Sequence, residues 1–268
     1  MKNYSKNHKE FYLLNSLSDI SVISDPFPHV VIENPISKKS YELLQESFPD
    51  LDYFRNGSSL YKEEVKSNKR YQMTQDDICT LLDKDHPWRL YAEINSSSYF
   101  LRDFLKIFST EIEKYYPDLY DRILSMKNIG VFHRDKFNSG NFDLLSHVSA
   151  DINSKVTFRS SVRGPHLDQP DKLYFALHYM KPDDDMCSSG GDLILWKHKD
   201  RLKTRFKRGY REIPEEDLDK HSVLKYGKNI LVIGLNTIDS VHSVSEREKG
   251  ANIRKFANIV SQVPFRLF

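Results

Sequence analysis

The sequence predicts an α+β fold in which helices come first and antiparallel strands follow. The clearest helical periodicity lies within residues 1–127, and short apolar or alternating runs separated by turn residues dominate residues 128–268. This order favours α+β over a parallel α/β sheet, in which strands and helices alternate. Antiparallel strands in this number would close into a barrel or a double-sheet jelly roll. We therefore expect one domain over residues 1–268, with N-terminal helices packed outside a jelly-roll core.

Apolar residues at three-to-four spacing mark the helices of the N-terminal part. The clearest helix covers residues 100–112, and Pro117 closes it. A second helix is expected over residues 36–48, and a short helical piece over residues 119–126. Residues 50–95 contain aromatic side chains without a clean period, so the pattern assigns them no element.

The expected strands are short runs rich in β-branched and aromatic residues. They cover residues 128–132, 156–162, 173–180, 190–196, 229–236 and 253–260, and a shorter strand at residues 30–32 precedes the helices. Residues 229–236 are apolar at nearly every position, which is typical of a central strand. A charged insert, residues 197–220, separates two of these strands, with basic residues first and acidic residues after.

The bulk composition argues against several classes of protein. The formal net charge is +2, and 40 basic residues nearly balance 38 acidic ones, so nothing indicates a nucleic-acid partner. No segment approaches the roughly 18 apolar residues that a membrane span needs. Two cysteines make no disulfide framework, and we expect a cytoplasmic protein. The sequence does not indicate an oligomeric state.

Three His-x-Asp patterns are candidates for metal binding, beginning at His133, His166 and His198. His198 lies among basic residues that would repel a cation, and His133 precedes a polar loop. Only His166 and Asp168 are followed by a long apolar strand and, further along, by a buried strand that leads to His242. In an extended segment His166 and Asp168 point to the same face.

Two imidazoles and one carboxylate form the facial triad of non-haem Fe(II) oxygenases, which leaves coordination positions open. The alternative for either histidine alone is a hydrogen-bonded structural role. His166, Asp168 and His242 can act as metal ligands, rather than as structural residues, only if they come together in space.

The same ordered set resembles the Fe(II)/2-oxoglutarate-dependent dioxygenases, closest to their prolyl 4-hydroxylase-like branch. The resemblance covers residues 156–262 and includes the apolar run after Lys172, the Gly190-Gly191-Asp192 turn and the basic pair Arg254-Lys255. It implies a double-stranded β-helix core, with His166, Asp168 and His242 as ligands of Fe(II) and 2-oxoglutarate as cosubstrate.

The resemblance also implies a cation for the distal carboxylate of 2-oxoglutarate, on the last core strand. Arg254 offers a bidentate fork and ranks before Lys255. Many members have a serine two residues after this arginine, whereas this chain has Phe256, which keeps Lys255 open. Arg247 ranks third. The hydroxyl groups of Tyr174 and Tyr179 are further candidates for contact with the cosubstrate, although each is more often core.

The activity that the resemblance implies is hydroxylation of an unactivated C–H bond, with release of succinate and CO₂. A small biosynthetic molecule is the first choice of substrate, and it would be anionic if the basic residues 197–211 form a lid that attracts it. The alternatives are a peptidyl hydroxylase of the same family and a non-catalytic jelly-roll protein that binds a ligand or partner.

Overall fold

The computed structural model describes residues 6–17, 20–62, 67–132, 134–182, 189–204 and 212–268. The helices of this part are α1 (Lys6–Lys9), α2 (Lys38–Glu46), α3 (Gln75–Leu81), α4 (Pro87–Asn95), α5 (Ser98–Tyr115) and α6 (Tyr120–Leu124). The strands are β1 (His29–Glu33), β2 (Arg55–Asn56), β3 (Ser59–Leu60), β4 (Arg70–Met73), β5 (Ile129–Val131), β6 (Leu144–Asn153), β7 (Tyr174–Met180), β8 (Leu193–His198), β9 (Leu218–Leu224), β10 (Lys228–Leu235), β11 (His242–Val244) and β12 (Arg254–Gln262).

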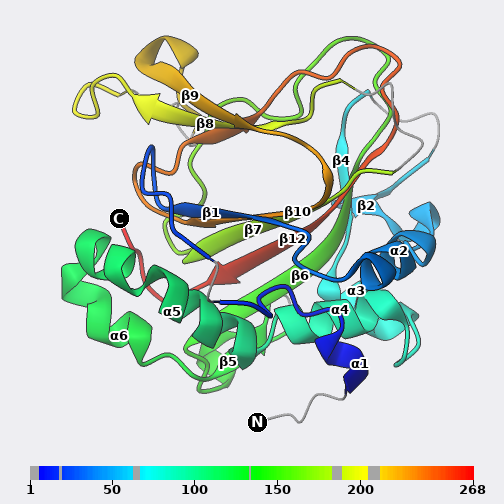
Figure 1. The fold of residues 1–268 in the computed structure, drawn as a ribbon, viewed down its shortest axis with the longest axis horizontal. Helices are drawn as coiled ribbons and strands as arrows, with labels where there is room; N and C mark the ends of the chain where they lie inside the picture. The colour runs from blue at the N-terminus through cyan, green and yellow to red at the C-terminus, as the bar shows by residue number, and fades with distance from the viewer. Residues whose placement is uncertain (1–5, 18–19, 63–66, 133, 183–188, 205–211) are drawn as a thin grey trace.

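The described strands form a major and a minor sheet. The major sheet has the order β1-β10-β7-β12-β6-β4-β2-β3, and β5 pairs with β6 in parallel; the minor sheet has the order β11-β8-β9. All other named pairs are antiparallel. Figure 1 shows the minor sheet above the major sheet and the helices below it, so the major sheet is the middle of three layers.

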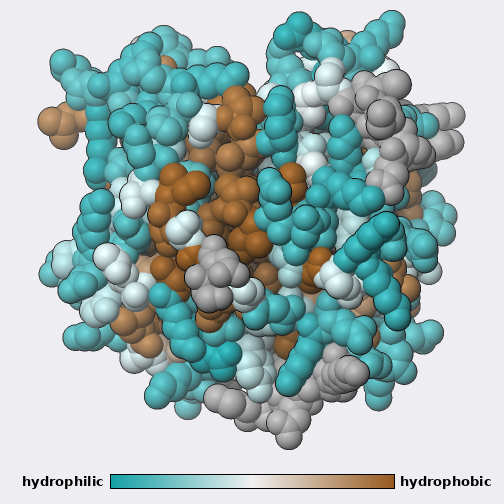
Figure 2. Space-filling view, viewed as in Figure 1, coloured by the Kyte–Doolittle hydropathy of each residue, from teal (hydrophilic) through white to brown (hydrophobic). Residues whose placement is uncertain are grey.

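Alternate side chains of β7 point to opposite faces of the major sheet and pack in two different cores. Tyr174 and Ala176 belong to the core between the major sheet and the helices. Phe175 and Tyr179 belong to a second core between the two sheets, where they meet Leu193 of β8. Figure 2 shows apolar side chains gathered in the upper middle of this face, with hydrophilic surface on both sides.

The structure confirms most expected elements and corrects one. Residues 156–162 are not a strand; they form bends with one isolated bridge, between Ser160 and Arg247. The strand on that side of the major sheet is β6, just before them, which no expected strand covered. Residues 50–95, left unassigned, contain α3, α4 and three short strands of the major sheet. The insert at residues 197–220 contains the end of β8 and the start of β9.

The helix α5 is attached to the sheet by aromatic packing. Phe104 is fully buried, and its ring centroid lies 4.7 Å from that of Phe108 and 4.6 Å from that of Tyr174. We expect Phe104→Ala to lower the free energy of unfolding by about 3–5 kcal/mol, because the deletion leaves a cavity in a packed core. Urea denaturation measures this loss.

Phe158 provides the matched control, because its side chain is 62% exposed. Phe158→Ala should change the free energy of unfolding by less than about 0.5 kcal/mol. Equal losses for the two variants would contradict the packing described for α5.

A buried histidine links the helices to the sheet on the same side. His178 Nδ1 lies 3.2 Å from the hydroxyl of Tyr91, and its Nε2 lies 3.0 Å from Oδ1 of Asn229. Because the amide oxygen of Asn229 can only accept, Nε2 carries the proton and Nδ1 accepts from Tyr91. Burial lowers the pKa of His178 to about 4, although the bond to Asn229 opposes the shift.

Stability should therefore depend on pH through His178. The unfolded chain takes up the proton near pH 6.5, and the folded chain only near pH 4. The stabilisation is present above pH 6.5 and is lost as the pH falls to 4, by about 3 kcal/mol. His178→Gln should make the pH dependence of unfolding less steep in this window, and His221→Gln, at an exposed position, is the matched control that should change the slope less.

Candidate metal centre

The three sequence-predicted ligands come together between the sheets. One ligand atom from each of His166, Asp168 and His242 lies within 4.8 Å of the others. Both histidines are buried, and the side chain of Asp168 is 14% exposed. Within the described ranges this is the only group of three His, Cys, Asp or Glu side chains with this spacing. Its donor set, two imidazoles and a carboxylate, fits a divalent iron with open positions.

Backbone hydrogen bonds hold the two histidines side by side. The amide of His166 donates to the carbonyl of His242 at 3.0 Å, and the amide of His242 donates back at 3.1 Å. His242 begins β11, opposite Leu195 of β8. The ring of Phe175 stacks on the imidazole of His242 with centroids 4.6 Å apart. The minor sheet therefore positions one imidazole directly, and the other through this bridge.

Each histidine presents a defined ring nitrogen. His166 Nδ1 lies 2.9 Å from the carbonyl of Gly164, and His242 Nδ1 lies 2.9 Å from the carbonyl of Ser240. Because carbonyl oxygens only accept, both Nδ1 atoms carry the proton. Both Nε2 atoms are left with their lone pairs, which is the tautomer that binds a metal.

The charges favour the ligating protonation states. Burial lowers the pKa of both imidazoles, and for His166 the nearby His242 and Arg163 add to the effect. Burial alone would raise the pKa of Asp168, but Lys172 and the neighbouring histidines outweigh it and hold that pKa well below its usual range. Lys172 Nζ lies 3.3 Å from Asp168 Oδ2. Two neutral imidazoles and one carboxylate are therefore ready to bind a cation.

Arg254 lies in a cage of aromatic rings between the two sheets. Its guanidinium carbon lies 5.0, 4.8 and 4.7 Å from the ring centroids of Tyr179, Tyr226 and Phe256. Nη1 donates to Oδ1 of Asn153 at 3.1 Å. The side chain is 3% exposed, and nothing in the described residues gives this charge a carboxylate within ion-pair distance.

Two buried donors of this cage have no acceptor. Neither Arg254 Nε nor the hydroxyl of Tyr179 makes a hydrogen bond within the described part of the chain, although Arg254 is close enough to affect the pKa of Tyr179. Burial raises the pKa of Tyr179 to about 12, so its hydroxyl keeps its proton at neutral pH. Unmatched buried donors are costly. The pair fits an incoming carboxylate, which accepts from both.

The glycine at position 191 makes room for this arginine. Its φ is +78°, and a Cβ there would lie 3.0 Å from Cδ and 3.1 Å from Nε of Arg254. The next residue, Asp192, accepts from the amide of Tyr226 at 2.9 Å and so holds one wall of the cage. The Gly190-Gly191-Asp192 turn noted in the sequence thus shapes the cavity around Arg254.

The other sequence candidates lie elsewhere. Lys255 points to the opposite face, with Nζ 4.5 Å from the ring centroid of Phe48. Tyr174 packs on Phe100 and Phe104 in the helix-side core, so its position gives no support to contact with a cosubstrate. Arg247 is buried, and its guanidinium donates to Oδ1 of Asn68 and to the backbone carbonyls of Ser154 and Asn252.

Sequence reasoning missed Asn153 and Tyr226. Asn153 lies on β6, where apolar Val148, Ala150 and Ile152 alternate with buried polar residues. This period-two pattern is a strand signal, and it would have located the polar face. Nothing in the residues around Tyr226 marks it as a member of the cage.

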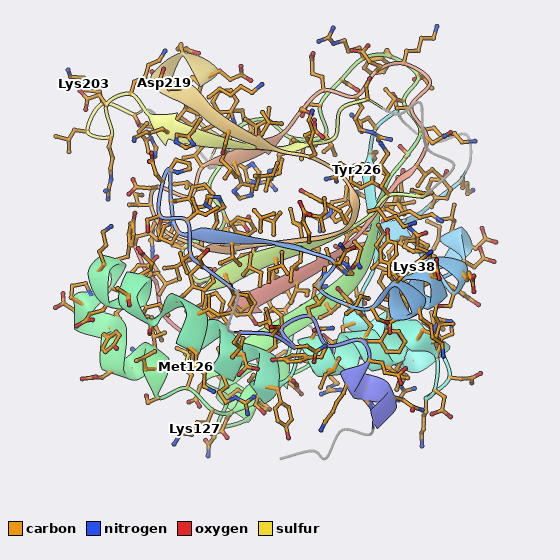
Figure 3. The ribbon with its side chains drawn as sticks, viewed as in Figure 1. Lys38, Met126, Lys127, Lys203, Asp219 and Tyr226 are labelled. Atoms are coloured by element: carbon orange, nitrogen blue, oxygen red, sulfur yellow. The ribbon has the colours of Figure 1, made fainter. Side chains whose placement is uncertain are left out.

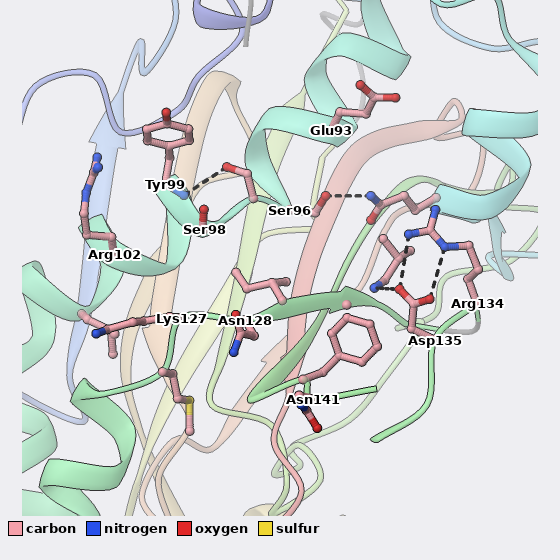
Figure 4. A pocket seen from close by; sticks show the side chains of 18 of the residues that line it. Glu93, Ser96, Ser98, Tyr99, Arg102, Lys127, Asn128, Arg134, Asp135 and Asn141 are labelled. Atoms are coloured by element: carbon pink, nitrogen blue, oxygen red, sulfur yellow. Dashed lines mark hydrogen bonds and ion pairs between the residues drawn. The ribbon is translucent and has the colours of Figure 1, made fainter. Parts of the chain in front are cut away.

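One large cavity of the described structure lies away from this centre. It has a volume of about 1350 Å³ and lies between α4, α5 and β5 (Figure 4). Its arginines have local partners, since Arg102 pairs with Asp103 and Arg134 with Asp135. None of its lining residues belongs to the His166, Asp168 and His242 group.

The basic part of the insert has acidic partners of its own. Lys197 pairs with Asp25, Arg201 with Asp239 and Lys203 with Asp200. Figure 3 shows Lys203 and Asp219 at one end of the minor sheet and Tyr226 at the other. These pairs give no support to a cationic lid, and residues 205–211 of that hypothesis lie outside the described residues.

No protein-family model and no curated protein matches the chain. Among solved structures, a prolyl 4-hydroxylase from Phytophthora capsici is 12% identical with a TM-score of 0.45, over 98% of this chain and 66% of that one. A prolyl hydroxylase from Trichoplax adhaerens, in complex with a peptide of hypoxia inducible factor, is 9% identical with a TM-score of 0.43, over 96% and 91%. A dioxygenase for auxin oxidation from Arabidopsis thaliana, bound to 2-oxoglutarate, is 11% identical with a TM-score of 0.41, over 88% and 82%. At these values the similarities assign no family.

No helix among the described residues is long and apolar enough to cross a membrane.

Metal binding should depend on His166 and not on the other His-x-Asp pattern that the structure describes. His166→Ala removes one of three ligands, and we expect Fe(II) affinity to fall by more than about a hundredfold. Anaerobic calorimetric titration measures the affinity. His198→Ala is the matched control, because His198 contacts Thr204 and the carbonyl of Ile238 instead. Equal affinity for the two variants would remove His166 from the metal site.

Proposed function

We propose that residues 1–268 form a single Fe(II)/2-oxoglutarate-dependent oxygenase domain, with the two sheets as the walls of a double-stranded β-helix. The observation that carries the proposal is the convergence of His166, Asp168 and His242, all in ligating protonation states. Binding of 2-oxoglutarate is supported by Arg254, whose buried Nε lacks an acceptor within the described residues.

The three ligands have distinct roles in this proposal. His166 and His242 would bind Fe(II) through Nε2, and Asp168 would supply the only anionic ligand. Lys172 holds the Asp168 carboxylate ionised and limits its rotation. The aromatic and aliphatic side chains between the sheets, including Phe175 and Leu195, exclude bulk water from the side of the centre that they cover.

Arg254 and Tyr179 would bind the distal carboxylate of 2-oxoglutarate. Arg254 Nε and the Tyr179 hydroxyl are the donors available to it, and Asn153 fixes the orientation of the guanidinium. Tyr179 thereby takes the place of the serine that many relatives have two residues after the arginine. Phe256, which occupies that position here, forms a wall of the cage.

Together, Fe(II) and 2-oxoglutarate supply oxidising chemistry in which a C–H bond, O₂ and 2-oxoglutarate become an alcohol, succinate and CO₂. The chain's own contribution is to place the cosubstrate, to keep the oxidant dry and to aim one C–H bond of the substrate at the metal. We propose a small molecule as that substrate, because a cavity of about 260 Å³ is lined by Lys172, the ion-pair partner of Asp168.

Anaerobic titration with Fe(II) and 2-oxoglutarate tests the proposal through the weak visible charge-transfer band of the chelate. We expect a band in the wild-type protein. Arg254→Gln should raise the 2-oxoglutarate concentration for half-saturation about tenfold or more, because a charge-assisted pair is lost. The band should persist at high cosubstrate concentration.

Lys255→Gln is the matched control, since the two cations are adjacent in sequence and lie on opposite faces of β12. It should bind 2-oxoglutarate like the wild type. A stronger effect at Lys255 than at Arg254 would reverse the assignment. A wild-type protein that is folded by circular dichroism but gives no band would favour a binding protein without redox metal.

A further inference from the structure

The metal and cosubstrate sites described above leave a second, smaller cavity near the metal centre without an assigned function. Its volume is about 260 Å³, and its lining residues come from β4, β6, β12, the segment that follows Asp168 and Phe132, just after β5. Lys172, the ion-pair partner of Asp168, is one of these residues. None of the three ligands lines the cavity, but the ion-pair partner of one of them does, and under the proposed function a substrate would lie here.

Arg70 is the best-fixed polar group of this cavity. Its Nε donates to Oδ1 of Asp151 at 2.6 Å, and the hydroxyl of Ser149 donates to the other oxygen of that carboxylate. Asp151 and Ser149 are fully buried, so this support is rigid and shielded from solvent. Asp151 and Asp168 raise the pKa of Arg70 in spite of the opposing effect of burial.

One edge of the Arg70 guanidinium faces the cavity. The side chain is 40% exposed and lines the cavity, while Asp151 holds it through Nε. Neither Nη atom makes a hydrogen bond to the described residues. Two parallel N–H groups held in this way match the two oxygens of a carboxylate.

The remaining lining indicates the size and charge of the ligand. Phe132, Leu145 and Val260 offer an apolar wall, whereas Gln72 and Asn258 offer carboxamides. Arg70 is paired with Asp151 and Lys172 with Asp168, and the lining carboxylate of Asp171 accepts from Gln262 at 2.7 Å. The cavity thus has no excess positive charge to balance a phosphate dianion, whereas a carboxylate needs only the local donors.

We propose that Arg70 is the specificity-determining residue of this cavity and binds the carboxylate of a small substrate with a compact apolar body. The inference rests on the proposed function, since the cavity is assigned to substrate through Lys172, which lines it and pairs with Asp168. Arg70 would fix the carboxylate at one end of the substrate, and the apolar wall would then limit which C–H bonds reach the metal.

Paired probes test the charge requirement. Isovalerate, benzoate and L-leucine are each compared with the corresponding carboxamide, and their dissociation constants for the Fe(II)- and 2-oxoglutarate-loaded protein are measured anaerobically by saturation-transfer NMR. We expect at least one carboxylate to bind about tenfold or more tightly than its amide. If no carboxylate binds more tightly than its amide, the proposal is overturned.

Variants locate the binding. Arg70→Gln should weaken the preferred carboxylate about tenfold or more and leave its amide unchanged. Arg159→Gln is the matched control, because Arg159 is an exposed arginine that pairs with Glu246 and Glu248 and does not line the cavity. Equal carboxylate affinity in the Arg70 and Arg159 variants would overturn the proposal.

Removal of Arg70 leaves Asp151 without its ion pair and can disturb folding. Arg70→Lys keeps a charge beside Asp151 but lacks the planar fork, so it should fold and still lose most of the carboxylate preference. The chelate band of each variant is recorded without probe. Failure of the band in the wild type refutes the oxygenase proposal. A normal band without a carboxylate preference refutes only the role of Arg70.

Discussion

The site depends on the reciprocal backbone hydrogen bonds between His166 and His242. They join a segment without regular structure to the first residue of β11, and so convert two distant positions of the chain into adjacent imidazoles. A backbone bridge of this kind fixes the Cα positions and leaves the rings to be oriented by their own Nδ1 contacts. Asp168 follows two residues later with its carboxylate on the same side. The minor sheet is small, but the geometry of the metal centre rests on it.

The two faces of the major sheet differ in character, and each has its own function. On the helix side it buries apolar residues together with a few satisfied polar ones, such as His178. On the side of the minor sheet, β6 presents Ser149, Asp151 and Asn153, and their burial is costly unless each is hydrogen-bonded. Such a polar face adds little to stability. Its presence is explained by the arginines that it orients.

The sequence predicted the parts of the site that depend on local pattern. The three candidate metal ligands are marked in the sequence by a His-x-Asp pair that precedes an apolar run and by a further histidine that follows a buried strand. The expected strands over residues 173–180 and 253–260 are present for the same reason. The strand over residues 156–162 was wrong, since alternation in a short polar segment does not guarantee a partner for its backbone. The missed strand β6 alternates too, but its polar positions interrupt the apolar run that was sought.

What the sequence could not show was which residues meet across strands. Register places Arg70 of β4 and Arg254 of β12 opposite the same residue, Asn153 of β6. Both guanidinium groups lie near the ring of Phe256, 5.7 Å from its centroid for Arg70 and 4.7 Å for Arg254. Two cations in one row repel each other, and among the described residues only Arg70 has a carboxylate partner, Asp151.

This imbalance distinguishes the two arginines. Arg70 has its charge offset within the protein and keeps an edge for a further ligand, so its contribution is orientation and selectivity. Arg254 is buried without a carboxylate among the described residues, and its Nε lacks an acceptor. Such a charge is unfavourable until an anion arrives, which gives the apoprotein a built-in preference for a bound carboxylate at that position. Under the proposed function, the same row of the sheet would therefore bind the cosubstrate on one side of Asn153 and discriminate among substrates on the other.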